Sequence, residues 1–163
     1  MPNLSKEASL TIATVYLLMV FATIIWGAYS LIAIELGRFE SFKLLFSCIL
    51  IGGIGGILYC LRGVYLNYCV RDQWTNKWIV WYLIRPLVSL ICGGVSYVFL
   101  KAGLLVLEAQ KENDASNLGF YALSFIAGMN VDNFIAKLED LADATWGIKK
   151  SRASQKDENV KKN

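Results

Sequence analysis

No charged residue occurs between Ala8 and Ile34, where the chain reads ASLTIATVYLLMVFATIIWGAYSLIAI. An apolar run of about 18 residues or more is long enough to cross the hydrocarbon core of a bilayer as a helix. Leu44 to Leu61 and Pro86 to Leu100 are two shorter apolar runs, and a weaker one extends from Ala115 to Val131. The sequence therefore predicts an integral membrane protein.

The composition argues against enzymatic chemistry. The 163 residues are 56% hydrophobic, so the length is committed to membrane helices and leaves no room for a separate soluble catalytic domain. The chain has no histidine, which removes histidine-dependent triads and histidine metal sites. Its four cysteines form no C-x-x-C pair and are typical of small buried apolar residues. We expect no catalytic residue, no metal site and no cofactor.

The apolar runs predict an all-α, polytopic membrane helix bundle. About four spans are expected, over residues 10–34, 44–61, 86–107 and 118–131, and they form a transmembrane domain of residues 1–130. The fourth segment is short and contains Gly119, Gly128 and Asn130, which leaves a re-entrant or tightly packed segment open. A cytoplasmic amphipathic helix over 131–147 and a basic, disordered tail over 148–163 are expected to follow.

The distribution of lysine and arginine predicts the orientation of these spans. Short loops that are rich in Lys and Arg stay in the cytoplasm, and both termini lie on the richer side. The basic tail has no aromatic residues among its lysines on which bases could stack, so the lipid bilayer is the expected partner and nucleic acid is not.

Small residues recur at helical spacing within the predicted spans. Gly52 and Gly56 form a G-x-x-x-G pair, with Gly53 and Gly55 beside them. Such spacing puts small residues on one helix face and lets two backbones approach closely. The contact forms either within one subunit or between copies of a homo-oligomer. The residues expected at helix-packing or oligomer contacts are Gly52, Gly53, Gly56, Ser89, Gly93, Gly94, Ser124 and Gly128.

The segment from Arg62 to Ile84 interleaves Tyr and Trp with basic residues. Because these rings favour the headgroup region, the segment is expected to be a loop along the inner leaflet surface. The alternative is a partner-docking surface with Trp74 and Trp78 as anchors. Arg85 and Pro86 are expected to open the third span, with Arg85 at headgroup level and paired with a phosphate or with Asp132.

An apolar seam predicts the amphipathic helix after the fourth span. Val131, Phe134, Leu138, Leu141 and Thr145 are spaced 3, 4, 3 and 4 residues apart, which makes two heptads, and Gly147 is placed to end the helix. The seam either packs on its own subunit or binds a partner, for which Phe134, Leu138 and Leu141 are the candidate residues.

A set of motifs lies between Arg85 and Leu141. It comprises Arg85-Pro86, Gly93-Gly94, Tyr97, Gly103-Leu104-Leu105, the run YALSFIAGM from Tyr121 to Met129, Asp132 and Phe134. In these motifs the segment resembles a two-helix module of small polytopic bacterial inner-membrane proteins of unassigned function, some of them in antiphage defence operons. The resemblance implies an inner-membrane sensor or effector with a soluble partner, and it assigns no catalytic residue.

Two functions follow from these patterns. The first is a non-enzymatic scaffold or sensor that oligomerises and docks a cytosolic partner, in a bacterial antiviral defence system if the resemblance holds. The alternative is an oligomeric pore or an effector that depolarises the membrane. A lipid-modifying enzyme is disfavoured, because no paired carboxylates occur at depth in the spans.

Overall fold

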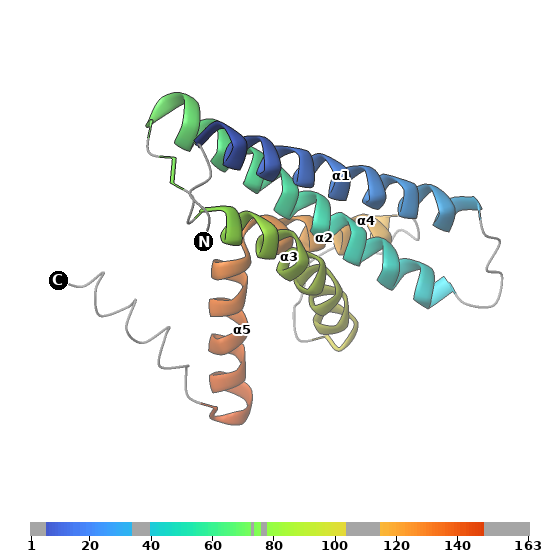
Figure 1. Cartoon of the computed structure of the whole chain (residues 1–163). Helices are drawn as coiled ribbons and strands as arrows, with labels where there is room; N and C mark the ends of the chain where they lie inside the picture. The colour runs from blue at the N-terminus through green and yellow to red at the C-terminus, as the bar shows by residue number, and fades with distance from the viewer. Residues whose placement is uncertain (1–5, 34–39, 73, 76–77, 104–114, 149–163) are drawn as a thin grey trace. The chain divides into compact units, whose positions relative to one another are not determined.

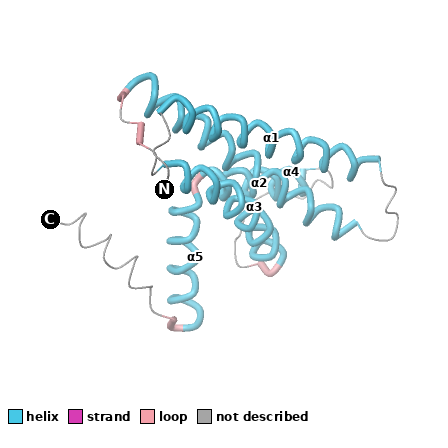
Figure 2. Tube along the Cα trace, viewed as in Figure 1, coloured by secondary structure: helices cyan, strands magenta, loops and turns pink. Residues whose placement is uncertain are grey.

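The computed structural model describes residues 6–33, 40–72, 74–75, 78–103 and 115–148. These residues are helical apart from short turns and contain no strand (Figures 1 and 2). The elements in chain order are α1 (Lys6–Ala33), α2 (Glu40–Tyr65), the π-helix η1 (Leu66–Val70), α3 (Trp78–Lys101), α4 (Ala115–Met129) and α5 (Val131–Trp146). The predicted all-α class is confirmed.

Three helices are long and apolar enough to cross a membrane, which identifies the chain as a membrane protein. The stretches are Glu7–Leu31, Phe42–Val70 and Trp78–Lys101. With 15 residues, α4 is only about 22 Å long, against about 30 Å for a hydrocarbon core. The predicted number of four spans is therefore approximate: three helices have the length of a span, and the fourth segment is a short apolar helix.

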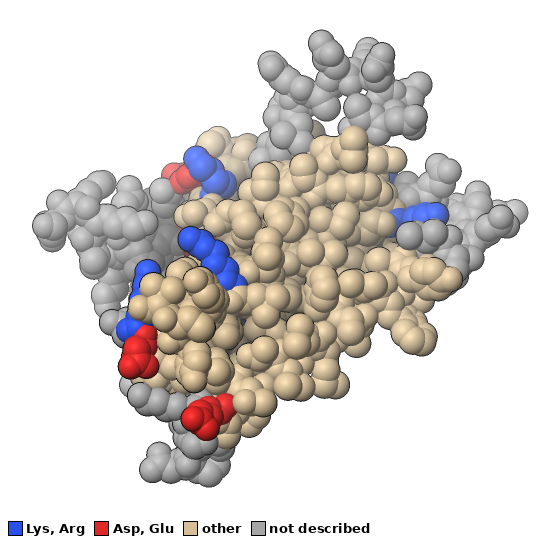
Figure 3. All heavy atoms as spheres, turned by 90° about the horizontal axis from the view of Figure 1, so that it is seen from above, with Lys and Arg blue, Asp and Glu red and all other residues tan. Residues whose placement is uncertain are grey.

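The chain consists of two compact units, residues 1–129 and 130–163. In the first unit, α1, α2 and α3 share a core of Ala13, Leu17, Cys60, Trp74 and Tyr82. The opposite side of α1 is apolar and exposed, as it is at Met19, Trp26 and Tyr29. In Figure 3 a broad uncharged surface separates the basic side chains at its two edges, as a lipid-facing surface requires.

The loop predicted between residues 62 and 84 is largely helical, so that expectation is wrong. α2 continues to Tyr65 and passes into η1, and α3 already begins at Trp78. Several aromatic residues of this segment pack against one another; for example, the rings of Trp81 and Tyr82 meet edge to face at 5.0 Å.

The third span does not open at Pro86, because Pro86 lies inside α3. A proline within a helix has no N–H for the carbonyl of the preceding turn and leaves that turn short of hydrogen bonds. In the same turn the Tyr16 hydroxyl donates to the Leu83 carbonyl at 3.2 Å, so α1 supplies a donor next to the proline. α3 ends at Lys101 and Ala102 and Gly103 form a turn, so the predicted helix is shorter there, and residues 104–107 of the predicted span lie outside the described residues.

The second unit contains α5, the helix predicted over residues 131–147. Gly147 ends it with a left-handed φ of 66°, and its N–H donates to the Asp143 carbonyl at 2.9 Å. This conformation costs a glycine little and is common at helix C-termini. Ile148 is described as non-helical, and the rest of the predicted basic tail lies outside the described residues.

Candidate functional site

Small residues bring the backbones of α2 and α3 into direct contact. A Cβ atom added to Gly52 would lie 2.6 Å from Gly93 Cα and 2.8 Å from the Ser89 carbonyl oxygen. A Cβ added to Gly93 would lie 2.5 Å from the Cys48 carbonyl oxygen. Because these neighbours are backbone atoms, no rotation of a side chain could relieve the overlap. The close approach of α2 and α3 thus requires glycine at both positions.

α4 joins the same contact, which we call the small-residue junction. A Cβ atom added to Gly128 would overlap the backbone of Gly52. A Cβ added to Gly55 would overlap the Phe125 carbonyl, and one added to Gly56 would overlap the Ser89 side chain. The last turn of α4 therefore packs against the middle of α2 and not against one of its ends.

Serine hydroxyls satisfy the backbone groups that the junction buries. Ser89 Oγ lies 2.9 Å from the carbonyl oxygens of both Arg85 and Gly128 and can donate to either. Gly128 is in the last turn of α4, where carbonyls lack a donor within the helix. On the same helices, the Ser96 and Ser124 hydroxyls share a hydrogen bond of 2.9 Å. These bonds let α4 end inside an apolar bundle.

The structure collects most of the predicted packing residues in one place within a single subunit. Gly53 and Gly94 face side chains instead, since a Cβ would lie 2.5 Å from Leu90 Cδ2 at Gly53 and 3.1 Å from Ile49 Cγ1 at Gly94. The prediction missed Gly55, although its position beside the G-x-x-x-G pair was a signal. The residues gathered at the junction are Gly52, Gly55, Gly56, Ser89, Gly93, Ser124 and Gly128. Because their faces are filled within one chain, the alternative that they form the contact between copies is not supported.

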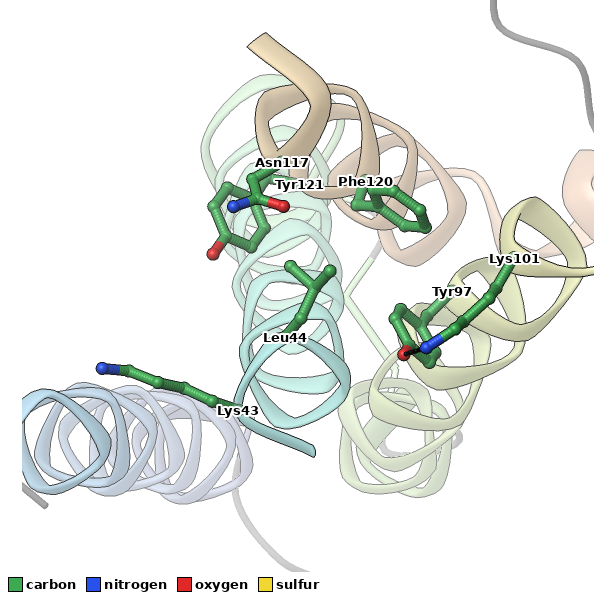
Figure 4. Close-up of a pocket in the computed structure, with 7 residues that line it drawn as sticks. All are labelled: Lys43, Leu44, Tyr97, Lys101, Asn117, Phe120 and Tyr121. Carbon is green, nitrogen blue, oxygen red and sulfur yellow. Dashed lines mark hydrogen bonds between the residues drawn. The ribbon is translucent and has the colours of Figure 1, made fainter. Parts of the chain in front are cut away.

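A polar pocket of about 480 Å³ lies where the start of α2, the end of α3 and the start of α4 meet (Figure 4). Tyr97 and Lys101 project from α3, and the Lys101 ammonium donates to the Tyr97 hydroxyl at 3.0 Å. Phe120 and Tyr121 project from α4 on different sides, and the Lys43 ammonium is directed away from Lys101. The two cations therefore do not converge on one point.

Arg85 lies at the opposite end of α3 and is buried, with 6% of its surface exposed. Its guanidinium carbon lies 4.9 Å from the centre of the Tyr59 ring and 5.4 Å from that of Trp81. These ring faces stabilise the cation within the bundle, and the expected position of Arg85 at headgroup level stays a prediction. Asp132 is exposed and belongs to the second unit, so its pairing with Arg85 stays a prediction.

Trp74 is not available as a docking anchor, which corrects that assignment. Its ring is 2% exposed and stacks on the Tyr82 ring at 5.5 Å, and Nε1–H donates to Ser9 Oγ at 2.8 Å. A buried indole N–H needs such a partner, and α1 provides it. Trp78 is 37% exposed and remains accessible.

The remaining candidates lie on α5. Phe134 is buried, whereas Leu138 and Leu141 are half-buried. Among the described residues, no group of His, Cys, Asp and Glu could hold a metal ion. Cys69 is exposed, and the other three cysteines are buried free thiols.

Comparisons of the chain with protein families, with curated proteins and with solved structures found no match.

Proposed function

We propose that the protein is a non-enzymatic scaffold or sensor of the bacterial inner membrane, with both termini in the cytoplasm, that docks a cytosolic protein through α5. The observation that carries the proposal is the two-sided character of α5. Leu138 and Leu141 are the accessible part of its apolar seam, since Phe134 is buried, whereas Asp132 and Asp140 are exposed. An acidic face is repelled by anionic lipid, which favours a protein as the partner of this helix.

The ending of α5 supports the same role. Gly147 stops the helix, so the seam lies on a helix of 16 residues that belongs to the second unit. A helix of about this length presents anchors at intervals of three and four residues, which is how helices are recognised in apolar grooves.

Native mass spectrometry of the detergent-extracted protein, co-expressed with the products of its neighbouring genes, tests the proposal. The unchanged chain is expected to carry a soluble protein partner. The double variant Leu138→Glu/Leu141→Glu is expected to lose it, because two carboxylates interrupt the seam. Ala136→Glu/Ala144→Glu is the matched control, since it adds the same charges at two exposed positions of α5. Retention of the partner by the seam variant, or absence of any partner, would contradict the proposal.

The proposed homo-oligomer needs a surface other than the small-residue junction, whose faces are filled within one chain. The same holds for the alternative of a pore. Backbone contacts close the centre of α2, α3 and α4, so a channel would have to form between subunits. Conductance of the purified protein in planar bilayers, with no soluble partner in the mass spectra, would favour the pore over the scaffold.

A further inference from the structure

A second, smaller cavity of about 290 Å³ lies where α2, η1 and α3 meet. Arg62 in the last turn of α2, Arg71 after η1, and Trp78 at the start of α3 all line it. These residues stand at the ends of two helices that are long enough to cross a membrane. When these helices cross a bilayer, this end of the bundle meets the lipid headgroups.

Positive charge is concentrated at this cavity. Two arginines line it, both exposed, and no carboxylate is among its lining residues. Behind its wall lies Arg85, whose guanidinium packs on the rings of Tyr59 and Trp81, two residues that also line the cavity.

The backbone is specialised at the same place. η1 is a π-helix, closed by the Arg71 N–H donating to the Leu66 carbonyl at 3.0 Å. Single π-helical turns occur frequently at functional sites because they are wider than an α-helical turn and redirect side chains. Asn67 of this turn lines the cavity, and its amide donates to the Tyr82 hydroxyl at 3.3 Å, which ties the turn to α3.

We propose that this cavity is a specific site for the phosphate of an anionic phospholipid headgroup. The planar guanidinium groups of Arg62 and Arg71 suit the oxygens of a phosphate better than lysine ammonium groups do. Trp78 and Trp81 supply rings that are apolar on one side and polar on the other, as the boundary between headgroup and acyl chain requires. The volume admits a headgroup, and the acyl chains remain in the bilayer.

The pocket of Figure 4 provides a matched control at the other end of the bundle. It also carries two cations, Lys43 and Lys101, but their ammonium groups diverge and Lys101 is already hydrogen-bonded to Tyr97. Removing these two charges changes the net charge as much as removing the two arginines. Any difference between the two changes thus reports the site and not the total charge.

The experiment is native mass spectrometry of the full chain released from micelles that contain equal amounts of phosphatidylglycerol and phosphatidylcholine. The unchanged protein is expected to retain phosphatidylglycerol preferentially, and Arg62→Gln/Arg71→Gln to weaken its retention about tenfold or more. Lys43→Gln/Lys101→Gln is expected to retain the lipid as the unchanged protein does. The single arginine variants give intermediate retention and remain informative if the double variant fails to fold.

Three results would overturn the proposal. The first is undiminished retention by the double arginine variant. The second is an equal loss in the arginine and lysine variants, which would indicate a general effect of charge. The third is that millimolar glycerol phosphate displaces the lipid and itself binds as well as the lipid does. A free phosphate ester would then be the ligand.

Discussion

Alanine at position 52 is expected to destabilise the bundle, whereas alanine at position 27 is not. The added Cβ at position 52 would lie 2.6 Å from Gly93 Cα, while the one at position 27 would lie 3.7 Å from the nearest methyl group of Leu50. Carbon atoms attract each other best at about 3.5–4.0 Å, so α2 and α3 would have to move apart by about 1 Å to admit the first methyl group.

The free energies can be compared because both glycines lie inside helices. Replacing a helical glycine by alanine stabilises a helix by about 0.5–1 kcal/mol through its intrinsic propensity. Overpacking costs about 1–3 kcal/mol. Gly27→Ala is therefore expected to be neutral or stabilising. The free energy of unfolding of Gly52→Ala should be about 1–3 kcal/mol below that of Gly27→Ala, because both variants gain the same helix propensity and only Gly52→Ala is overpacked.

Melting temperatures of the two detergent-solubilised variants test this reasoning. In a chain of this size each kcal/mol corresponds to about 2–4 °C, so Gly52→Ala should melt several degrees below Gly27→Ala. Size-exclusion chromatography after stepwise heating measures the melting temperatures of both variants. Equal melting temperatures would mean that the backbones of α2 and α3 do not touch at Gly52, and the description of the small-residue junction would fail.

Three further results are expected. Ser89→Ala removes the hydrogen bond to Gly128 and should lower stability by about 0.6–1.7 kcal/mol, measured by the same heating assay. Trp74→Phe removes the bond from the indole to Ser9 and also leaves a cavity at a buried position, so it should cost about 1 kcal/mol or more in that assay. A water-soluble maleimide should label one cysteine per native chain, Cys69, and should reach it in inside-out vesicles but not in intact cells, because we place this end in the cytoplasm.

Each of these results has a control. Ser30→Ala should leave stability nearly unchanged, because that hydroxyl bonds only to the carbonyl of its own helix at Trp26 among the described contacts. Trp78→Phe should also be close to neutral, since Trp78 is partly exposed. Labelling of Cys69 in intact cells would contradict the proposed orientation, and labelling of a second cysteine in the native chain would contradict the burial of the others.

Much of the bundle could be predicted because apolar runs and glycine spacing are local signals. The charge-free run at Ala8 marks α1, and the spacing of Gly52 and Gly56 marks the face that contacts α3. The position of Gly147 after an apolar seam predicts where α5 ends. Each of these features depends on residues within one helix or just beyond it.

The errors arose where contacts distant in sequence decide the outcome. The burial of Arg85 was not predicted, because the Tyr59 ring that stabilises its cation comes from another helix. Trp74 looked like a surface anchor because its acceptor, Ser9, is far away in the chain. Pro86 looked like the start of a span because a proline usually opens a helix, and nothing local reveals that α1 supplies a donor in the preceding turn.

The shortness of α4 has a consequence for biosynthesis. A helix of 15 residues with serine and glycine inserts into lipid less readily on its own than the three longer helices do. The groups that receive it, Gly52 on α2 and Ser89 on α3, belong to segments that leave the ribosome earlier. The surface of α2 and α3 that packs against α4 can therefore assemble in the membrane before α4 leaves the ribosome.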